Sequence, residues 1–377
     1  MVKERYIGIM SGTSMDGVDV VLCEIDASHC TLLAEYEHPF PPELKEEILQ
    51  AINGSVTLQK VGDIDHKLGV LFADAVNVLM QNASLAPESV CAIGSHGQTL
   101  WHQPSGETPF SMQLGDPNII TARTGMRVVT DFRRKDMALD GSGAPFAPAF
   151  HAFLLGSNNG SMCVVNIGGI ANITVLNETL LGYDTGPGNM LMDAWIMQHK
   201  GVGYDKEGVW AREGKVNYRL LDGMMEDAYF STPYPKSTGR EKFNLEWLNK
   251  ILTMSSSGLT RGSDVKIPDQ VGNDKGITSE DVQRTLLELT ALSISNEVLK
   301  FNPDMLLLCG GGTKNSLLVE RIAALMPNIQ VGIMEQADSL EAMMMAWLAY
   351  KRLHNEPVNL KHVTGAKENT ILGGIYQ

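Results

Sequence analysis

Four glycine-rich turns, each placed directly after a short apolar run, constrain the fold of this chain more than any other feature. They span residues 8–17, 166–172, 184–189 and 310–315. Glycine permits positive φ and a close backbone approach, and successive amides in such loops form concavities that hold phosphate oxygens. One turn alone predicts only a turn. Four of them after predicted strands, two containing an aspartate, predict a phosphate-binding site.

The chain opens with a hairpin. Apolar runs at residues 6–9 and 18–25 flank the first turn, and a third run covers 31–36. This pattern differs from the strand–loop–helix opening of a Rossmann or Walker unit, and none of the four turns matches GxxxxGK[ST]. We therefore exclude a Walker-type nucleotide site.

The opening pattern returns in the second half of the chain. Three strands are expected there, at residues 162–166, 171–176 and 180–183. Two halves that each open as strand, glycine turn and strand indicate a duplicated α/β plan. We expect two domains, 1–130 and 131–377, and leave open whether the last helix packs back on the first.

Apolar periodicity and capping residues predict the longer helices. Apolar side chains recur every three or four residues over 57–81 and again over 279–301. Asp116 followed by Pro117 reads as an N-cap and first helical position of a short helix to Thr124. Further elements are expected as a helix over 190–199 and strands over 90–94 and 305–309.

Three segments are harder to interpret. Residues 131–148 are polar, rich in glycine and proline and without periodicity, so we expect a connector that forms one wall of a site. Residues 201–275 look irregular, and we assign them no chemistry. Asp338-Ser-Leu-Glu341 has the form of a capping box with Glu341 at the third helical position.

Composition limits the partners and the compartment. Acidic residues outnumber basic ones by 44 to 30, giving a net charge of −14, which argues against nucleic acid as a partner. Five scattered cysteines without a CxxC pair predict free thiols in a reducing, cytoplasmic compartment. No apolar run approaches the ~20 residues of a membrane span. A two-fold homodimer is the assembly to expect by default, because it is the commonest one among soluble proteins.

A family resemblance rests on nine motifs, which occur in order from residue 8 to 350. They are GIMSGTSMDGVD, SHGQTLWH, LGDPNII, DFR, GAPFAPAFH, NIGGIANIT, GYDTGPGN, GGGTKN and EAMMMAWLAY. Their general order is similar to the hexokinase–actin–Hsp70 superfamily, and together they resemble the anhydro-N-acetylmuramic acid kinase family. The resemblance implies an actin-like, ribonuclease H-like α/β fold, with two duplicated domains around a nucleotide cleft.

The resemblance also implies a reaction. ATP, water and 1,6-anhydro-N-acetylmuramic acid would give ADP and N-acetylmuramic acid 6-phosphate, a step of murein recycling. Asp184 matches the family's catalytic aspartate in DTGPGN, and a carboxylate there suits a general base for water. The alternative for Asp184 is an N-cap or an Asx-turn.

The nucleotide contacts that the resemblance implies lie in the four turns. They are Gly12, Thr13, Ser14, Met15, Asp16, Gly17, Val18, Asp19, Asn166, Gly168, Gly169, Gly186, Gly188, Gly310, Gly311 and Gly312. Asp16 or Asp19 would position Mg²⁺ beside ATP, because hard cations take oxygen ligands. Asp19 as an exposed strand residue is the competing interpretation.

Three residues are candidates for binding the sugar. Thr99 and Arg133 follow from SHGQT and DFR, and an arginine fork matches the lactyl carboxylate of a muramic acid. Arg133 as a surface charge is the alternative. Glu341 matches a sugar-site glutamate of the family as well as the capping box. We assign His96 no acid–base role.

Two other functions fit the same residues. Another sugar kinase of the actin-like fold would use Asp184 on an ordinary hydroxyl. A non-catalytic switch would bind a nucleotide and move its domains. A product assay in ¹⁸O water and an Asp184→Asn variant separate these possibilities.

Overall fold

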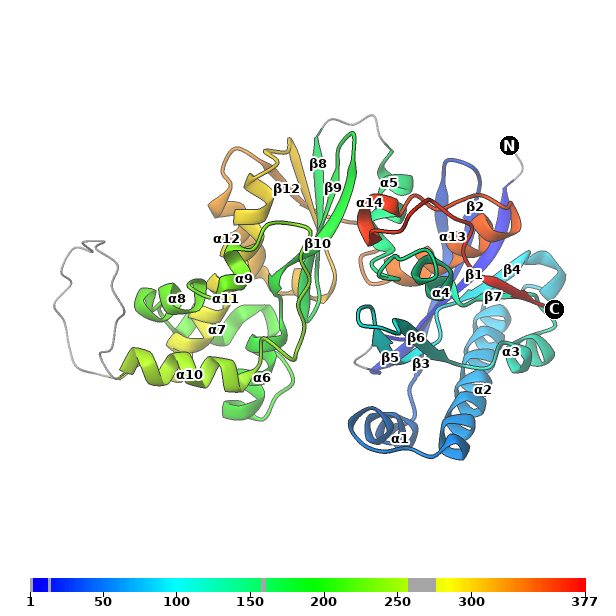
Figure 1. The fold of residues 1–377 in the computed structure, drawn as a ribbon, viewed down its shortest axis with the longest axis horizontal. Coiled ribbons are helices and arrows are strands. Elements are labelled where there is room, and N and C mark those ends of the chain that lie inside the picture. The colour runs from blue at the N-terminus through cyan, green and yellow to red at the C-terminus, as the bar shows by residue number, and fades with distance from the viewer. Residues whose placement is uncertain (1–2, 13–14, 157–160, 257–275) are drawn as a thin grey trace. The chain divides into compact units, whose positions relative to one another are not determined.

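The computed structural model describes residues 3–12, 15–156, 161–256 and 276–377 (Figure 1). The chain forms two compact units with separate cores. Unit 1 comprises Met1–Ser157 and Asp338–Gln377, and unit 2 comprises Asn158–Ala337. Unit 2 is therefore inserted into unit 1.

The elements of unit 1 follow in chain order. They are β1 (Glu4–Met10), β2 (Gly17–Ile25), β3 (Cys30–Pro39), α1 (Pro42–Asn53), α2 (Leu58–Asn82), η1 (Pro87–Ser89), β4 (Ala92–Ser95), β5 (Gln98–Gln103), β6 (Phe110–Leu114), α3 (Pro117–Thr124), β7 (Val128–Thr130), α4 (Phe132–Met137), α5 (Ala147–Leu155), α13 (Leu340–Leu353), α14 (Lys361–Thr364) and β13 (Gly374–Tyr376).

Unit 2 contains the remaining elements. They are β8 (Met162–Ile167), β9 (Ile170–Leu176), β10 (Leu180–Pro187), α6 (Met190–Lys200), η2 (Lys206–Gly208), α7 (Val209–Glu213), α8 (Tyr218–Met225), α9 (Ala228–Ser231), α10 (Leu245–Ser256), α11 (Ser279–Leu299), β11 (Met305–Cys309), η3 (Gly311–Lys314), α12 (Ser316–Leu325) and β12 (Gln330–Ile333).

The two main sheets share one topology. In unit 1 the strand order is β13-β7-β4-β1-β2-β3, and in unit 2 it is β10-β9-β8-β11-β12. In both, the first three strands form an antiparallel meander. The fourth strand runs parallel to the first and the fifth parallel to the fourth. This repeated order confirms the duplicated α/β plan of the actin-like fold. The expected cleft between the domains remains a prediction.

The division of the chain differs from the expected boundary at residue 130. The reason is that α4 packs against β6, α13 against β1, β2 and β4, and α5 against α13. All of these are elements of unit 1. Figure 1 shows the blue N-terminal strands and the orange to red C-terminal helices within that unit. The fold class could be predicted from local patterns, whereas this boundary depends on contacts between elements far apart in the chain, such as α13 and β1.

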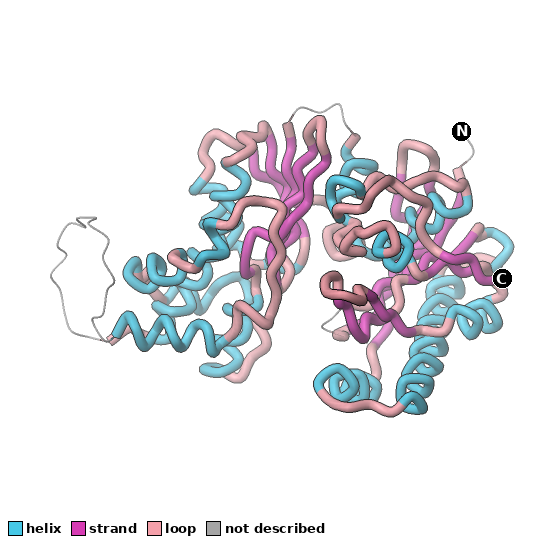
Figure 2. The backbone as a smooth tube through the Cα atoms, viewed as in Figure 1, coloured by secondary structure: helices cyan, strands magenta, loops and turns pink. Residues whose placement is uncertain are grey.

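Helix α13 approaches the first sheet unusually closely. Gly8 and Gly94 are paired neighbours on β1 and β4. A Cβ atom on Gly8 would lie 1.8 Å from the Ala342 carbonyl oxygen, and one on Gly94 would lie 1.9 Å from the Met345 carbonyl oxygen. Because side chains alternate along a strand, Ile7 and Ile9 point to the other face, into the core with α1 and α2. The sheet therefore lies between two helical layers (Figure 2).

The structure confirms the predicted ends of α3 and the predicted start of α2. The Asp116 carboxylate accepts the Asn118 N–H at 2.8 Å, and α3 ends at Thr124 before Gly125 at φ 71°. α2 begins after Thr57, whose hydroxyl accepts the Lys60 N–H.

Three other expectations are corrected. Residues 131–148 contain α4 and the start of α5, and α4 is only 6 residues long, too short to show periodicity. Of the segment 201–275, the structure describes residues 201–256, and these contain η2 and helices α7 to α10, so the described part is not irregular. The capping box at Asp338 is absent, because α13 begins at Leu340 with Ser339 as N-cap and no side-chain cap bond. The Ser339 hydroxyl instead donates to Glu35.

The glycine contact with α13 gives the first prediction. A Gly94→Ala substitution should lower the free energy of unfolding by at least ~2 kcal/mol, because the added methyl overlaps helix backbone that cannot move aside. Gly62→Ala in α2 is the matched control, because nothing lies within 4 Å of its added Cβ atom and alanine favours a helix interior. Urea unfolding of both variants measures the difference; equal stabilities would contradict the packing argument.

Candidate active site

Three of the four glycine turns converge in unit 2. They follow the carboxyl ends of β8, β10 and β11, which point to one edge of the sheet. The Gly188 N–H donates to the Gly169 carbonyl at 2.9 Å, and the Asn189 N–H donates to the Gly168 carbonyl at 2.8 Å. Ligands of open α/β sheets bind at such carboxyl edges.

The predicted nucleotide-binding glycines fall into two groups. Gly311 has nothing within 4 Å of an added Cβ atom, and Gly168 and Gly169 have only contacts of 3.4 Å or more. A Cβ atom on Gly311 would point into open space, whereas one on Gly168 or Gly169 would make an ordinary van der Waals contact. By contrast, a Cβ atom on Gly310 would lie 2.1 Å from the Asn166 side chain, and one on Gly312 would lie 2.3 Å from Ile167. Positions 310 and 312 therefore require glycine, because the loops pack too closely there for a side chain.

Two further glycines are also held by packing. A Cβ atom on Gly188 would lie 2.3 Å from the Gly168 carbonyl oxygen. Gly186 has φ 155° at a bulge of β10, and a Cβ atom there would lie 3.0 Å from Phe230.

Asp184 lies within β10, opposite Asn172, and not at a helix N-terminus. Its Oδ2 atom accepts the Ser237 hydroxyl at 2.8 Å and the Thr238 N–H at 3.0 Å. Among the described residues no hydrogen bond reaches Oδ1. Burial raises the pKa of Asp184, although the two hydrogen bonds lower it. The N-cap and Asx-turn interpretations of this residue are therefore wrong.

The first glycine turn belongs to unit 1. Thr13 and Ser14 lie outside the described residues. The Met15 N–H donates to the Gly12 carbonyl, while the side chains of Met15 and Val18 are buried in the core. A Cβ atom on Gly17 would lie 2.5 Å from the Glu37 carboxylate. Any ligand contact of Met15, Gly17 or Val18 would therefore come from the backbone.

The turn is tied to the motif after β4. The Ser11 hydroxyl donates to Gln98 Oε1 at 2.6 Å, and both side chains are buried. Thr99, the next residue, accepts a bond from Gln113 at 3.3 Å. Asp16 is exposed and pairs with Lys45 at 3.1 Å.

Arg133 is held in place by neutral acceptors. Its Nε and Nη2 atoms donate to His96 Nε2 at 3.1 and 2.7 Å, and Nη1 donates to the Gly143 carbonyl at 2.7 Å. Because His96 Nε2 accepts from arginine, His96 Nδ1 carries the proton and donates to the Gly97 carbonyl. Burial, together with the positive charge of Arg133, lowers the pKa of His96 to about 3.

No carboxylate of the described residues is therefore bonded to Arg133. Burial lowers the pKa of Arg133 to about 10, and the nearby charges of Glu341 and Asp136 oppose this. The guanidinium remains protonated at neutral pH. It is half-buried, so Arg133 is no simple surface charge, and three of its five N–H donors are used.

Asp19 lies among other carboxylates. It pairs across the strands with Glu37, and Glu341, Asp338 and Glu35 are also close enough to act on its charge. Burial, reinforced by these negative charges, raises the pKa of Asp19 to about 6. Like charges opposite each other in a sheet are destabilising. A half-buried acid in such surroundings is typical of a functional site rather than of an exposed strand position.

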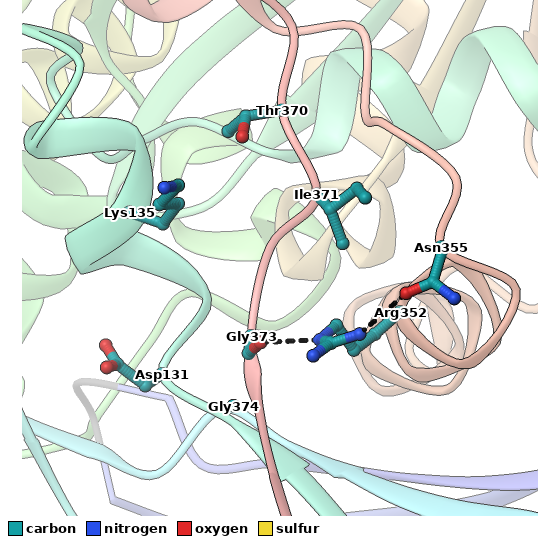
Figure 3. A pocket seen from close by; sticks show the side chains of 8 residues that line it. All are labelled: Asp131, Lys135, Arg352, Asn355, Thr370, Ile371, Gly373 and Gly374. Atoms are coloured by element: carbon teal, nitrogen blue, oxygen red, sulfur yellow. Dashed lines mark hydrogen bonds between the residues drawn. The ribbon is translucent and has the colours of Figure 1, made fainter.

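A separate hollow of about 470 Å³ opens on unit 1 (Figure 3). None of the predicted site residues lines it. Arg352 at its wall is bonded to the Gly373 carbonyl at 2.8 Å and to Asn355 at 3.1 Å. These bonds join α13 to the C-terminal segment, which indicates a structural role for this arginine.

Sequence reasoning missed several residues around the candidate site. Residues 201–275 were assigned no chemistry, yet Ser237 and Thr238 bind the Asp184 carboxylate. His96 was assigned no acid–base role, and its contact with Arg133, which it orients, was not predicted. Neither contact has a local sequence signal, because the partners lie 53, 54 and 37 positions apart.

The duplicated α/β plan, the converging glycine turns and an aspartate with one unbonded carboxylate oxygen define a kinase of the actin-like fold. A family model described as Anhydro-N-acetylmuramic acid kinase matches residues 4–377. The chain belongs to the anhydro-N-acetylmuramic acid kinase family.

Individual relatives agree with this assignment. The anhydro-N-acetylmuramic acid kinase of a Sulfurovum species is 64% identical over 376 residues, covering 100% of both chains. That of Photobacterium profundum is 50% identical over 392 residues, covering 100% of this chain and 99% of the relative.

Two solved structures are more distantly similar. The activator of the 2-hydroxyisocaproyl-CoA dehydratase from Clostridium difficile with bound ADPNP has a TM-score of 0.44 and 10% identity, covering 93% of this chain and 95% of the other. A glucokinase of the ROK family from Streptomyces griseus, in complex with glucose and AMPPNP, has a TM-score of 0.40 and 13% identity, covering 92% and 99%.

The raised pKa of Asp19 gives a pH-dependent prediction. Between its ordinary value near 3.8 and about 6, the folded state holds a proton that the unfolded state has lost, so the contribution of Asp19 to stability falls as pH rises. Asp19→Asn should therefore stabilise the ligand-free protein by about 1–2 kcal/mol at pH 7.5 and leave it nearly unchanged at pH 4. Urea unfolding at both pH values measures this.

Asp16→Asn is the control for this measurement. Asp16 is exposed and paired with Lys45, so its loss should change stability by less than ~1 kcal/mol. A stabilisation by Asp19→Asn that is the same at both pH values would contradict the electrostatic explanation.

Proposed function

We propose that this chain uses ATP and water to open the 1,6-anhydro ring of 1,6-anhydro-N-acetylmuramic acid and to phosphorylate its O6. The products are N-acetylmuramic acid 6-phosphate and ADP, which places the reaction in murein recycling. Family membership supports the substrate pair. The observation that carries the mechanism is Asp184, whose carboxylate has one oxygen held by two donors and the other open.

The bond changes balance without any further reactant. Asp184 Oδ1 takes a proton from water as the water oxygen bonds to the anomeric carbon. The bond from that carbon to O6 breaks, and O6 takes the electron pair. O6 then bonds to the γ-phosphorus of ATP, and the bond to the β–γ bridging oxygen breaks to release ADP. Phosphoryl transfer of this kind requires positioning and charge neutralisation more than covalent help.

Asp184 is suited to act as a general base. A base is most effective when its pKa lies near the working pH, and burial raises the pKa of Asp184 toward that range. The hydrogen bonds to Oδ2 fix the orientation of the carboxylate. Both features favour proton transfer through Oδ1.

The glycine turns would hold the phosphates of ATP. Gly311 has open space beside its α-carbon, and Gly168 and Gly169 are not crowded by their neighbours. In unit 1 taken by itself, the nucleotide contacts that family membership suggests are Gly12, Asp16, Asp19 and the backbone of Met15, Gly17 and Val18.

Arg133 would bind the lactyl carboxylate of the sugar. Two of its N–H donors are unused in the structure, and its charge is bonded only to neutral acceptors. An arginine in this state can form a bidentate pair with a ligand carboxylate. Thr99 and Glu341 would bind other polar groups of the sugar. The negative charge of Glu341 also raises the pKa of Arg133 and so favours its charged form.

Mg²⁺ fits the donor chemistry around Asp19. In the described part of the chain, no group of three or more acidic, histidine or cysteine side chains could hold a metal ion. Mg²⁺ in kinases needs only one or two carboxylates beside substrate phosphates and water. Asp19, which is crowded by other negative charges, would supply one ligand, and Asp16 a second if it leaves Lys45. Bound there, Mg²⁺ would neutralise phosphate charge.

Location and assembly are part of the same proposal. We infer a cytoplasmic enzyme that functions as a two-fold homodimer, the commonest form of soluble enzymes. The net charge of −14 does not favour nucleic acid as a partner. Within the described ranges, no helix is both long and apolar enough to cross a bilayer.

The function is tested by turnover in ¹⁸O water. The wild-type protein should place the label on the anomeric oxygen of the product, because water attacks that carbon. Asp184→Asn should retain ATP binding and lower kcat by about 10²–10⁴-fold, because the base is lost. Phosphorylation of ordinary hexoses without action on the anhydro sugar would support the other sugar kinase. An unchanged rate in Asp184→Asn would remove Asp184 as the base.

The role of Arg133 is tested with two sugars. Arg133→Met should raise KM for the anhydro-muramic substrate by about 10–100-fold, since hydrogen bonds to charged groups contribute about 1.5–3 kcal/mol. The analogue without the lactyl group, 1,6-anhydro-N-acetylglucosamine, should react equally with wild type and variant. Arg134→Met is the control, because Arg134 is exposed and pairs with Asp131. An equal loss for both sugars would contradict carboxylate recognition.

A further inference from the structure

A short segment of unit 2, residues 234–238, encloses Asp184 on the side opposite β9. The Asp184 N–H donates to the Lys236 carbonyl at 3.0 Å. Ser237 and Thr238 donate to Oδ2 of the same residue. Tyr229, just before the segment, donates its hydroxyl to the Asp184 carbonyl at 2.7 Å. The backbone and the carboxylate of Asp184 thus both depend on where this segment lies.

The segment is anchored by a buried ion pair. Lys236 Nζ lies 2.7 Å from Glu297 Oε1, and the two side chains are 2% and 3% exposed. Lys236 also donates to the Tyr229 carbonyl at 3.2 Å and lies over the Tyr229 ring.

Glu297, on α11, connects the segment with the strand of Asp184. Its Oε2 atom accepts the hydroxyl of Tyr183, the residue before Asp184, at 3.0 Å. Lys300 donates to the same oxygen at 2.6 Å. The Glu297 carboxylate therefore contacts both β10 and the 234–238 segment and fixes their positions relative to each other.

We propose that the Lys236–Glu297 pair is a positioning device for Asp184, which holds the Ser237 and Thr238 donors against Oδ2 and leaves Oδ1 for the reacting water. This inference rests on the proposed role of Asp184 as the base. Neither Lys236 nor Glu297 is bonded to the Asp184 carboxylate, so Lys236 acts through the backbone of the segment and Glu297 acts through Lys236 and Tyr183.

Stability alone does not explain this pair. Replacing a buried ion pair by uncharged residues of similar volume is often neutral or stabilising, because desolvation offsets the attraction of the charges. The reason for keeping the pair is then the geometry that it imposes. Burial raises the pKa of Glu297, but the bonds from Lys236 and Lys300 outweigh burial and lower it, so the carboxylate is ionised at neutral pH.

The test uses the full chain with both charges removed, Lys236→Met together with Glu297→Gln, so that no buried charge is left unpaired and Tyr183 keeps an acceptor. We expect a stability close to wild type. We also expect kcat to be at least ~10-fold lower and KM for ATP to be unchanged, since a displaced base slows the reaction. The acid limb of the kcat–pH profile should move up by about 0.5–1 pH unit, because Asp184 loses donors that favour its charged form.

A matched control removes another ion pair of the same helix. Arg321 Nε on α12 lies 2.7 Å from Glu288 on α11, and this pair has no bond to the segment or to β10. Arg321→Met with Glu288→Gln should leave both kcat and the acid limb unchanged. Ser237→Ala should reproduce the shift of the acid limb with little loss of stability, and Ser237→Thr should restore it. A Lys236→Met/Glu297→Gln protein with wild-type kcat and an unmoved acid limb would overturn the proposal.

A second readout does not depend on turnover. The difference in unfolding free energy between each background and its Asp184→Asn derivative, measured from pH 4 to 8, reports the pKa of Asp184. We expect this pKa to be higher in the Lys236→Met/Glu297→Gln background. An equal pKa in both backgrounds would contradict positioning. If Asp184→Asn retains wild-type turnover, the proposed base is wrong, whereas the pKa comparison still decides whether the pair acts on Asp184.

Discussion

The close contact between α13 and the first sheet is the constraint on which unit 1 depends. The helix backbone lies directly over Gly8 and Gly94, where no side chain fits. Because its axis is fixed by that contact, the start of α13 lies near the carboxyl ends of β1 and β4. Glu341, in the first turn, thereby reaches the surroundings of Arg133 and Asp19. A packing requirement in the core thus determines the electrostatics of the candidate sugar site.

In unit 2 the corresponding constraint is electrostatic. The buried Glu297 carboxylate receives bonds from two lysines and a tyrosine that come from separate parts of the chain. In both units, hydrogen bonds from residues distant in the chain hold the side chains proposed for chemistry. His96 does this for Arg133 with a neutral ring, which leaves the charge of the arginine available.

The elements with local signals could be predicted from the sequence. β11 was predicted at 305–309, and α3 at its capping residues, because apolar runs and Asp-Pro caps act over a few residues. The duplicated plan followed from the repeated hairpins. The 234–238 segment could not be predicted as part of the site, because its bonds to Asp184 join residues 53 and 54 positions apart. The bond of Ser339, the observed N-cap residue, to the distant Glu35 likewise has no local sequence signal.

The insertion of unit 2 into unit 1 has a consequence for synthesis on the ribosome. All residues of unit 2 have been made before α13 exists, so that unit can complete its core while the chain is still growing. The first sheet, although made earliest, must wait for residues 340–353 with its glycine face uncovered. Unit 2 can therefore complete its fold before unit 1, although synthesis begins with unit 1, and a chain that stops before residue 340 lacks the helix that covers the first sheet.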